Sequence, residues 1–169
     1  AVPALNADPG LRHLRILVID DSPNAREIFQ ALLNTFGYRP TIVASAEEGL
    51  AVLQDAEQPY DLVLMDWKMP MMDGFEAARK VRTELALITQ PKIIMVTAYG
   101  NEEARQRVMQ EGLDGYLTKP VSASSLLDEI MRVCGRAAVA TSHSGETQRE
   151  ALLIEQLKDM RILLVEDND

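Results

Sequence analysis

The fold of this chain of 169 residues is decided by the stretch Asp61-Leu-Val-Leu-Met-Asp66-Trp-Lys-Met-Pro70-Met-Met-Asp73-Gly74. Its apolar run ends in the carboxylate of Asp66, and a loop that contains proline and glycine follows. A short apolar run between turn signals predicts a strand buried on both faces, as in a parallel sheet. Open α/β sheets bind their ligands at the carboxyl ends of their strands, where Asp66 would lie. An isolated aspartate in this place more often only begins a turn, so the interpretation depends on the rest of the chain.

Strand and helix patterns alternate along the sequence. Four further apolar runs are predicted strands, at residues 15–20, 41–44, 92–97 and 114–118. Apolar residues at helical spacing predict a helix after each strand, at about residues 23–36, 45–54, 74–85, 102–111 and 122–135. Five such alternations predict βαβ units with helices on both faces of a parallel sheet. The predicted fold class is α/β, a flavodoxin-like doubly wound five-stranded parallel sheet with strand order 2-1-3-4-5.

Three segments carry further packing expectations. The last helix should face inward with Leu126, Leu127, Ile130, Met131 and Cys134. The helix at 102–111 is rich in charge and poor in large apolar residues, so it should pack loosely. Met69, Met71 and Met72 are most simply loop packing, with contact to a partner as the alternative because methionine is adaptable.

The composition is that of a soluble globular protein, with 47% hydrophobic and 25% charged residues. A formal net charge of −9 and a pI near 4.7 argue against a nucleic-acid partner, because such proteins present a basic face. The single cysteine, Cys134, cannot form an internal disulfide, which is compatible with the cytoplasm. We find neither an apolar run of membrane-spanning length nor a signal-peptide pattern.

The chain contains an internal repeat. Residues 161–168, Arg-Ile-Leu-Leu-Val-Glu-Asp-Asn, align with residues 15–22, Arg-Ile-Leu-Val-Ile-Asp-Asp-Ser, and the flanking residues match as well. We therefore expect a linker tail at 1–11, a domain at 12–136, a linker at 137–150 and the truncated start of a second such domain at 151–169. The first residues lack Met and the last follow an apolar run, so the sequence is interpreted as a piece of something longer.

Polar side chains lie at the carboxyl ends of four of the predicted strands: Asp20 and Asp21, Asp66, Thr97, and Lys119. The predicted fold brings these strand ends together, and three carboxylates in one crevice repel each other. A divalent cation would cancel that cost, and Mg²⁺ prefers oxygen ligands. An aspartate beside a cation, a lysine and a hydroxyl can attack phosphorus and become an aspartyl-phosphate.

Four separated motifs add a family resemblance. They are Asp-Asp-Ser at 20–22, Met-Asp-Trp-Lys-Met-Pro-Met-Met-Asp-Gly at 65–74, Val-Thr-Ala at 96–98 and Tyr-Leu-Thr-Lys-Pro at 116–120. With these motifs in this order, residues 12–136 closely resemble the receiver domain of two-component response regulators. The resemblance implies that Asp66 is the phosphoacceptor and takes a phosphoryl group from a phosphohistidine on a partner.

The resemblance also implies roles for the neighbouring residues. Asp21 and Asp66 would ligate Mg²⁺ directly, Asp20 through water, and Lys68 by its backbone carbonyl. Lys119 would pair with the phosphoryl group. The hydroxyl of Thr97 would move in to bond a phosphoryl oxygen, and the ring of Tyr116 would swing inward behind it. The Lys119–Pro120 peptide is expected to be cis, and Tyr116 can also be plain core.

Two positions are candidates for tuning the phosphoryl lifetime. Lys68 adds a second cation at the mouth of the site, where a neutral side chain is common in the family. Tyr99, two residues after Thr97, can crowd the approach of water. We hypothesise that these two side chains set how long the phosphoryl group lasts.

A receiver followed by the start of a second one resembles the tail of a hybrid sensor histidine kinase, which would act in a phosphorelay. The expected phosphodonor is a histidine kinase or a phosphotransfer domain, and other domains of the same chain are expected partners. We expect no nucleic-acid partner and no membrane contact by this segment. It should be a monomer or weak dimer in the cytoplasm, whether or not the parent protein is anchored in a membrane. Enzymatic activity would be limited to the receiver's own aspartyl phosphorylation and dephosphorylation, with a kinase as the parent chain.

Other classes fit less well. A haloacid-dehalogenase-type hydrolase needs an Asp-x-Asp pattern after its first strand, and Asp20-Asp21-Ser22 lacks the second acid. A P-loop nucleotidase needs Gly-x-x-x-x-Gly-Lys-Ser/Thr, which is absent. A flavodoxin-like electron carrier would share the fold, but the acids would repel a flavin phosphate. The remaining alternative is a receiver-like protein-binding module that is not phosphorylated.

Overall fold

The structure is a computed structural model that describes residues 11, 13–98, 100 and 102–140, the last five by their backbone alone. Internal contacts divide the chain into two units, residues 1–136 and 137–169. The described side chains all belong to the first unit. The second predicted receiver-like segment, at 151–169, lies outside the described residues.

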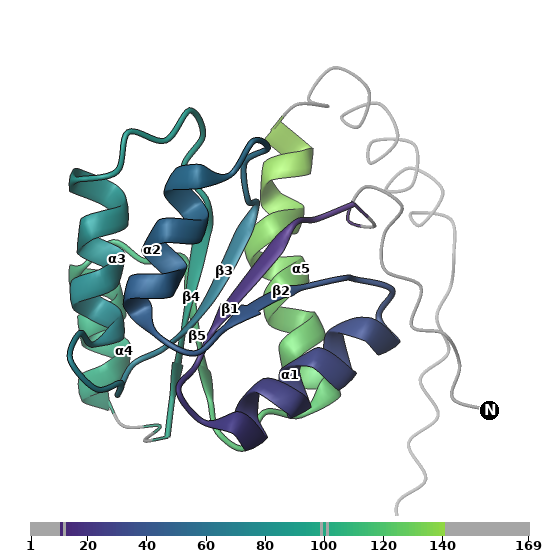
Figure 1. Ribbon diagram of the computed structural model, residues 1–169. Helices are drawn as coiled ribbons and strands as arrows, with labels where there is room; N and C mark the ends of the chain where they lie inside the picture. The colour runs from purple at the N-terminus through teal and green to yellow at the C-terminus, as the bar shows by residue number, and fades with distance from the viewer. Residues whose placement is uncertain (1–10, 12, 99, 101, 141–169) are drawn as a thin grey trace, which may run out of the picture. The chain divides into compact units, whose positions relative to one another are not determined.

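Five strands and five helices alternate along the described part of the chain (Figure 1). The strands are β1 (Ile16–Ile19), β2 (Thr41–Val43), β3 (Leu62–Asp66), β4 (Lys92–Thr97) and β5 (Gly115–Thr118). The helices are α1 (Pro23–Thr35), α2 (Ala46–Asp55), α3 (Gly74–Thr83), α4 (Glu102–Gln110) and α5 (Ala123–Ala140). Each predicted element is present, and most boundaries differ from the prediction by one or two residues.

The five strands form one parallel sheet with the order β2-β1-β3-β4-β5, which confirms the predicted flavodoxin-like topology. The order reverses between β1 and β3, which are neighbours in space although β2 separates them in the sequence. In the register, Ile19 lies opposite Met65 and Asp66 lies opposite Val96. The carboxyl ends of β1, β3 and β4 therefore meet at one edge of the sheet, where such folds bind ligands.

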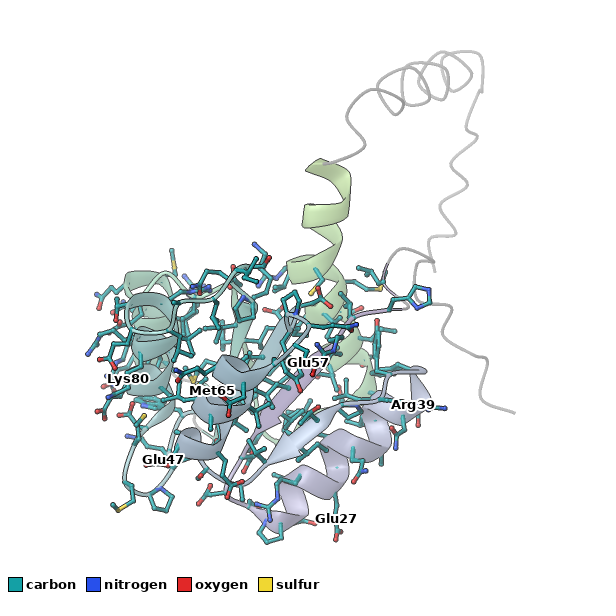
Figure 2. The ribbon with its side chains drawn as sticks, turned by 45° about the horizontal axis from the view of Figure 1, so that its top comes forward. Glu27, Arg39, Glu47, Glu57, Met65 and Lys80 are labelled. Carbon is teal, nitrogen blue, oxygen red and sulfur yellow. The ribbon has the colours of Figure 1, made fainter. Side chains whose placement is uncertain are left out.

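Helices cover both faces of the sheet (Figure 1). Alternate residues of β3 belong to opposite cores, because successive side chains of a strand point to opposite faces. Val63 and Met65 pack with α2, α3 and α4, whereas Leu62 and Leu64 pack with α1 and α5. Figure 2 shows charged side chains such as Glu27 on the outside of the molecule, in contrast to the fully buried Met65. The central strand is thus fixed by packing on both sides, and so is the residue that ends it.

Three helices that follow the carboxyl ends of strands begin with side-chain caps. The Ser22 hydroxyl accepts a hydrogen bond from the Ala25 amide, with Pro23 in the first turn, and the Asp73 carboxylate accepts one from the Glu76 amide. Ser45 caps α2 in the same way. Such caps satisfy backbone donors that the first turn leaves unpaired. They fix where α1 and α3 begin, directly after Asp20-Asp21 and the Asp66 loop.

Two packing predictions are each wrong at one residue. Met131 is 40% exposed, and Val133 takes the inward position beside Ile130 and Cys134. The buried stripe of α5 follows steps of three and four from Leu126, and Met131 lies at its flank. Met71 is 95% exposed and has a positive φ of 70°, so it does not pack within its loop as Met69 does.

Candidate functional site

Three carboxylates lie together at the carboxyl edge of the sheet. One oxygen from each of Asp20, Asp21 and Asp66 lies within 4.8 Å of the others. Asp20 and Asp66 are buried, with 1% and 6% of their surface exposed, whereas Asp21 is exposed. Burial strengthens the repulsion between like charges because the surroundings are less polarisable than water. The arrangement is therefore costly unless cations neutralise it.

The ammonium group of Lys119 forms ion pairs with two of these carboxylates, Asp20 and Asp66. Its Nζ lies 2.8 Å from Asp20 Oδ2 and 3.2 Å from Asp66 Oδ1. The Lys119 amide donates a hydrogen bond of 2.8 Å to the Thr97 carbonyl, and the following bond to Pro120 is cis, as predicted. Burial lowers the pKa of Lys119, but hydrogen bonding to Asp20 and the nearby charges of Asp66 and Asp20 raise it above its usual value overall. The lysine is accordingly held in its charged form.

The environment of Asp66 opposes its ionisation when no metal is present. Burial, followed by the charge of Asp20, raises the pKa of Asp66 from 3.8 to about 6, although Lys119 acts in the opposite direction. One lysine thus does not compensate three acids. The donor set fits a divalent cation of the Mg²⁺ type, because it offers several carboxylate oxygens around uncompensated negative charge.

The loop after Asp66 is shaped by a glycine at the start of α3. A Cβ atom placed on Gly74 would lie 2.3 Å from the Asp66 carbonyl oxygen and 2.8 Å from Met95 Sδ. The Gly74 amide instead donates a 2.8 Å hydrogen bond to the Trp67 carbonyl. Close approach of α3 to the end of β3 therefore requires glycine here.

The other predicted site residues lie as follows. Thr97 is buried at the end of β4, beside β3. Tyr116 is half-buried and packs against the core on the α2, α3 and α4 face, which is compatible with a core residue and with an aromatic ring that moves. The exposed Lys68 has its Nζ 4.2 Å from the centre of the Trp67 ring. Tyr99 lies outside the described residues.

Sequence reasoning missed two arginines near the site. Arg26 of α1 donates hydrogen bonds to the backbone carbonyls of Asp20 and Asp21. Its place one turn into a helix that begins after an acidic pair was a usable signal. Arg107 of α4 packs over the rings of Phe75 and Trp67, with its Cζ 4.3 Å and 5.6 Å from their centres. No local pattern marks that long-range contact.

A hollow of about 390 Å³ adjoins Lys119 on the α1 side of the site. Its walls include Ala25 and Ile28 of α1 and the segment Pro120–Val121 after β5. Ile28 is 43% exposed although it is a large apolar residue. An apolar surface therefore lies directly beside the lysine of the acidic cluster. Among the described residues, no helix is both long and apolar enough to cross a membrane.

A family model for the response regulator receiver domain matches residues 16–131. A 14.6 kDa protein of Leptolyngbya boryana without a characterised function is 38% identical over 124 residues, which are 73% of this chain and 92% of that protein. The sensor protein GacS of Pseudomonas syringae pv. syringae is 35% identical over 156 residues, which are 88% of this chain but 17% of GacS.

A solved structure of a receiver domain is also similar to this chain. The receiver domain of the sensor histidine kinase PA1611 of Pseudomonas aeruginosa PAO1 is 31% identical, with a TM-score of 0.63. The match covers 72% of this chain and 98% of that domain, and a magnesium ion is coordinated in the active-site cleft of that domain.

Proposed function

This chain belongs to the response regulator receiver domains of two-component systems, and we propose that it acts as a phosphoacceptor in a phosphorelay. Asp66 is the phosphoacceptor. The observation that carries this assignment is the buried Asp66 carboxylate at the end of β3, which lies 3.2 Å from Lys119 within the acidic cluster. Receiver domains accept a phosphoryl group from histidine kinases or phosphotransfer domains, and this site has the charges that such a transfer needs.

In the transfer, a carboxylate oxygen of Asp66 attacks the phosphorus of a phosphohistidine. The bond between phosphorus and the histidine nitrogen breaks as the bond to oxygen forms, and the electron pair returns to the imidazole. Lys119 neutralises charge on the transferring group, and Thr97 bonds a phosphoryl oxygen after the transfer. Positioning and electrostatics therefore do most of the work.

Receiver domains bind Mg²⁺ at an acidic site, and we propose that this chain binds it with Asp20, Asp21, Asp66 and the backbone carbonyl of Lys68. The bound ion would supply positive charge that stabilises the transferring phosphoryl group. Before it binds, Asp20 and Asp66 share the positive charge of Lys119.

Phosphorylation would convert the site into a signal. It adds about −1.5 to −2 charges and strong acceptors to Asp66. Thr97 and Tyr116 then reposition, and the surface formed by α4, β5 and α5 changes its preferred partner. The described packing of α4 suits an element that moves, because its buried residues are only Ala104 and Val108. Such coupling typically amounts to about 1–3 kcal/mol.

The apolar hollow beside Lys119 is the proposed docking place for the phosphodonor. A phosphohistidine must approach Asp66 with its own protein attached, so apolar surface next to the site can hold that protein. Ile28, Pro120 and Val121 supply this surface. The acidic character of the chain, with a net charge of −9, disfavours a nucleic-acid partner.

We propose a hybrid sensor histidine kinase as the parent protein, with a receiver at 12–136, a linker at 137–150 and the start of a second receiver at 151–169. The internal repeat and the match to GacS support this context. The receiver would then work in the cytoplasm, with a histidine kinase or phosphotransfer domain as its donor and other domains of the chain as partners, as a monomer or weak dimer.

Lys68 and Tyr99 are proposed to tune the phosphoryl lifetime. The decay of the phosphorylated protein should be faster in Lys68→Asn and in Tyr99→Ala than in the parent. Equal decay in all three proteins would refute this role.

The proposed function is tested by incubating the chain with Mg²⁺ and a small phosphodonor such as acetyl phosphate, and measuring its intact mass. The parent should gain the mass of one phosphoryl group, and Asp66→Asn should gain none. A folded parent that is never phosphorylated would favour the alternative, a receiver-like binding module.

A further inference from the structure

Arg26 joins α1 to the turn that carries two of the clustered carboxylates. Its Nη1 donates a hydrogen bond of 2.8 Å to the Asp20 carbonyl and one of 2.9 Å to the Asp21 carbonyl. Both carbonyls lie just before the first residue of α1. Two amides of the first helical turn bond Ser22 instead: that of Ala25 donates to the Ser22 hydroxyl and that of Arg26 to the Ser22 carbonyl.

The turn is thereby held on two sides. Within it, the Ser22 amide donates a 2.9 Å hydrogen bond to Asp20 Oδ1. From outside it, the guanidinium of Arg26 holds the backbone of Asp20 and Asp21 together. Mutual repulsion of the carboxylates would otherwise favour a turn that carries the exposed Asp21 away from its neighbours.

We infer that Arg26 is a positioning residue, which holds the Asp20-Asp21 turn in the conformation that binds a divalent cation. This inference rests on the proposed function, because it concerns the same site. Arg26 acts through the backbone of the two aspartates, and it need not touch the ion or the phosphoryl group. Partners that orient metal ligands in this way typically change metal affinity about 10- to 100-fold.

The sign of the effect separates this role from simple electrostatics. A cation beside an acidic cluster repels Mg²⁺, so removing its charge alone should strengthen Mg²⁺ binding. Loss of positioning should weaken Mg²⁺ binding, because part of the binding free energy is then used to order the turn. The two accounts therefore predict opposite changes in the dissociation constant for Mg²⁺.

The experiment is an Mg²⁺ titration of the whole chain, followed by the fluorescence of Trp67, the single tryptophan, which directly follows Asp66. Arg26→Gln removes both hydrogen bonds and the charge, whereas Arg26→Lys keeps the charge and can make fewer bonds. Arg79→Gln is the matched control, since Arg79 is an exposed arginine of α3 that pairs with Glu111. Hydrogen exchange of the Ser22 amide in the metal-free protein is a second readout.

Arg26→Gln should raise the Mg²⁺ dissociation constant about tenfold, Arg26→Lys should raise it less, and Arg79→Gln should leave it unchanged. Exchange of the Ser22 amide should be faster in Arg26→Gln than in the parent. If Arg26→Gln does not fold, the dissociation constant of Arg26→Lys for Mg²⁺ is the test, and it should exceed that of the parent. A folded Arg26 variant with an unchanged or lower dissociation constant would overturn the positioning role alone. A parent chain without a saturable response to Mg²⁺ would overturn the proposed function as well.

Discussion

Lys119 Nζ lies between Asp20 and Asp66, 2.8 Å from Oδ2 of the first and 3.2 Å from Oδ1 of the second. The lysine comes from the end of β5 and the two acids from the ends of β1 and β3. Only the sheet topology brings these three strand ends together. The central ion pairs of the site are thus a direct consequence of the strand order.

Replacing Lys119 should separate catalysis from metal binding. Lys119→Gln removes the charge that stabilises the transferring phosphoryl group, so phosphorylation by a small phosphodonor at saturating Mg²⁺ should slow by about 100-fold. The affinity for Mg²⁺ should not weaken, because a competing cation has been removed. Timed intact-mass measurements and the Trp67 fluorescence titration give the two quantities.

Lys92→Gln is the matched control for this variant, because Lys92 lies at the amino end of β4 and pairs with Asp114. It should phosphorylate at the parental rate. Equal rates for Lys119→Gln and the parent would show that Lys119 takes no part in the transfer.

The metal-free domain should be destabilised by Asp66 at neutral pH. Burial, and then the charge of Asp20, raise the pKa of Asp66 from 3.8 to about 6. Between these two values the folded protein holds a proton that the unfolded chain has lost, so the contribution of Asp66 to stability falls as the pH rises. The free energy of unfolding of Asp66→Asn should therefore exceed that of the parent by roughly 1–3 kcal/mol at pH above about 6. The difference should shrink toward pH 4.

Denaturant unfolding of both proteins without metal, across this pH range, measures the difference. Added Mg²⁺ should stabilise the parent more than Asp66→Asn, because the variant lacks one of the carboxylates. A difference that grows as the pH falls would contradict the assigned environment of Asp66.

A methyl group at position 74 should disturb the phosphoacceptor directly. The Cβ of Gly74→Ala would meet the Asp66 carbonyl at 2.3 Å, so the end of β3 or the start of α3 must shift. We expect a loss of stability of about 1–3 kcal/mol and slower phosphorylation. Gly135→Ala is the control, because a Cβ there meets nothing within 4 Å and alanine favours helix. Similar stability of the Gly74 variant and the parent would contradict the tight approach.

A charge in the apolar hollow should affect protein donors alone. Ile28→Asp should slow phosphotransfer from a phosphorylated histidine phosphotransfer domain by about tenfold or more, since it buries a charge against the donor. The rate with a small phosphodonor should stay at the parental value. Met109→Asp, on an exposed position of α4, is the control and should change neither rate. Slowing with both donors would point to damage at the site, and slowing with neither would refute docking at Ile28.

Much of this fold could be predicted from the sequence, because apolar runs and capping residues are local signals. Asp20, Asp66 and Lys119 follow apolar runs, and the alternation of elements determines which run neighbours which. Arg26 was marked by its place one turn into a helix that follows an acidic pair, and sequence reasoning missed that local signal. The contacts of Arg107 could not be predicted in that way, since they depend on how α4 packs against residues far away in the sequence. The exposure of Met71 and Met131 was mispredicted for a related reason, as hydrophobicity alone does not say which side of a loop or helix faces the core.

The most direct test of the central claim is to locate the phosphoryl group chemically. After incubation of the chain with Mg²⁺ and acetyl phosphate, borohydride reduces an aspartyl-phosphate to homoserine, which peptide mass spectrometry can assign to a position. We expect homoserine at position 66 and at no other aspartate. Homoserine at another aspartate, or none in protein that has gained a phosphoryl group, would contradict it.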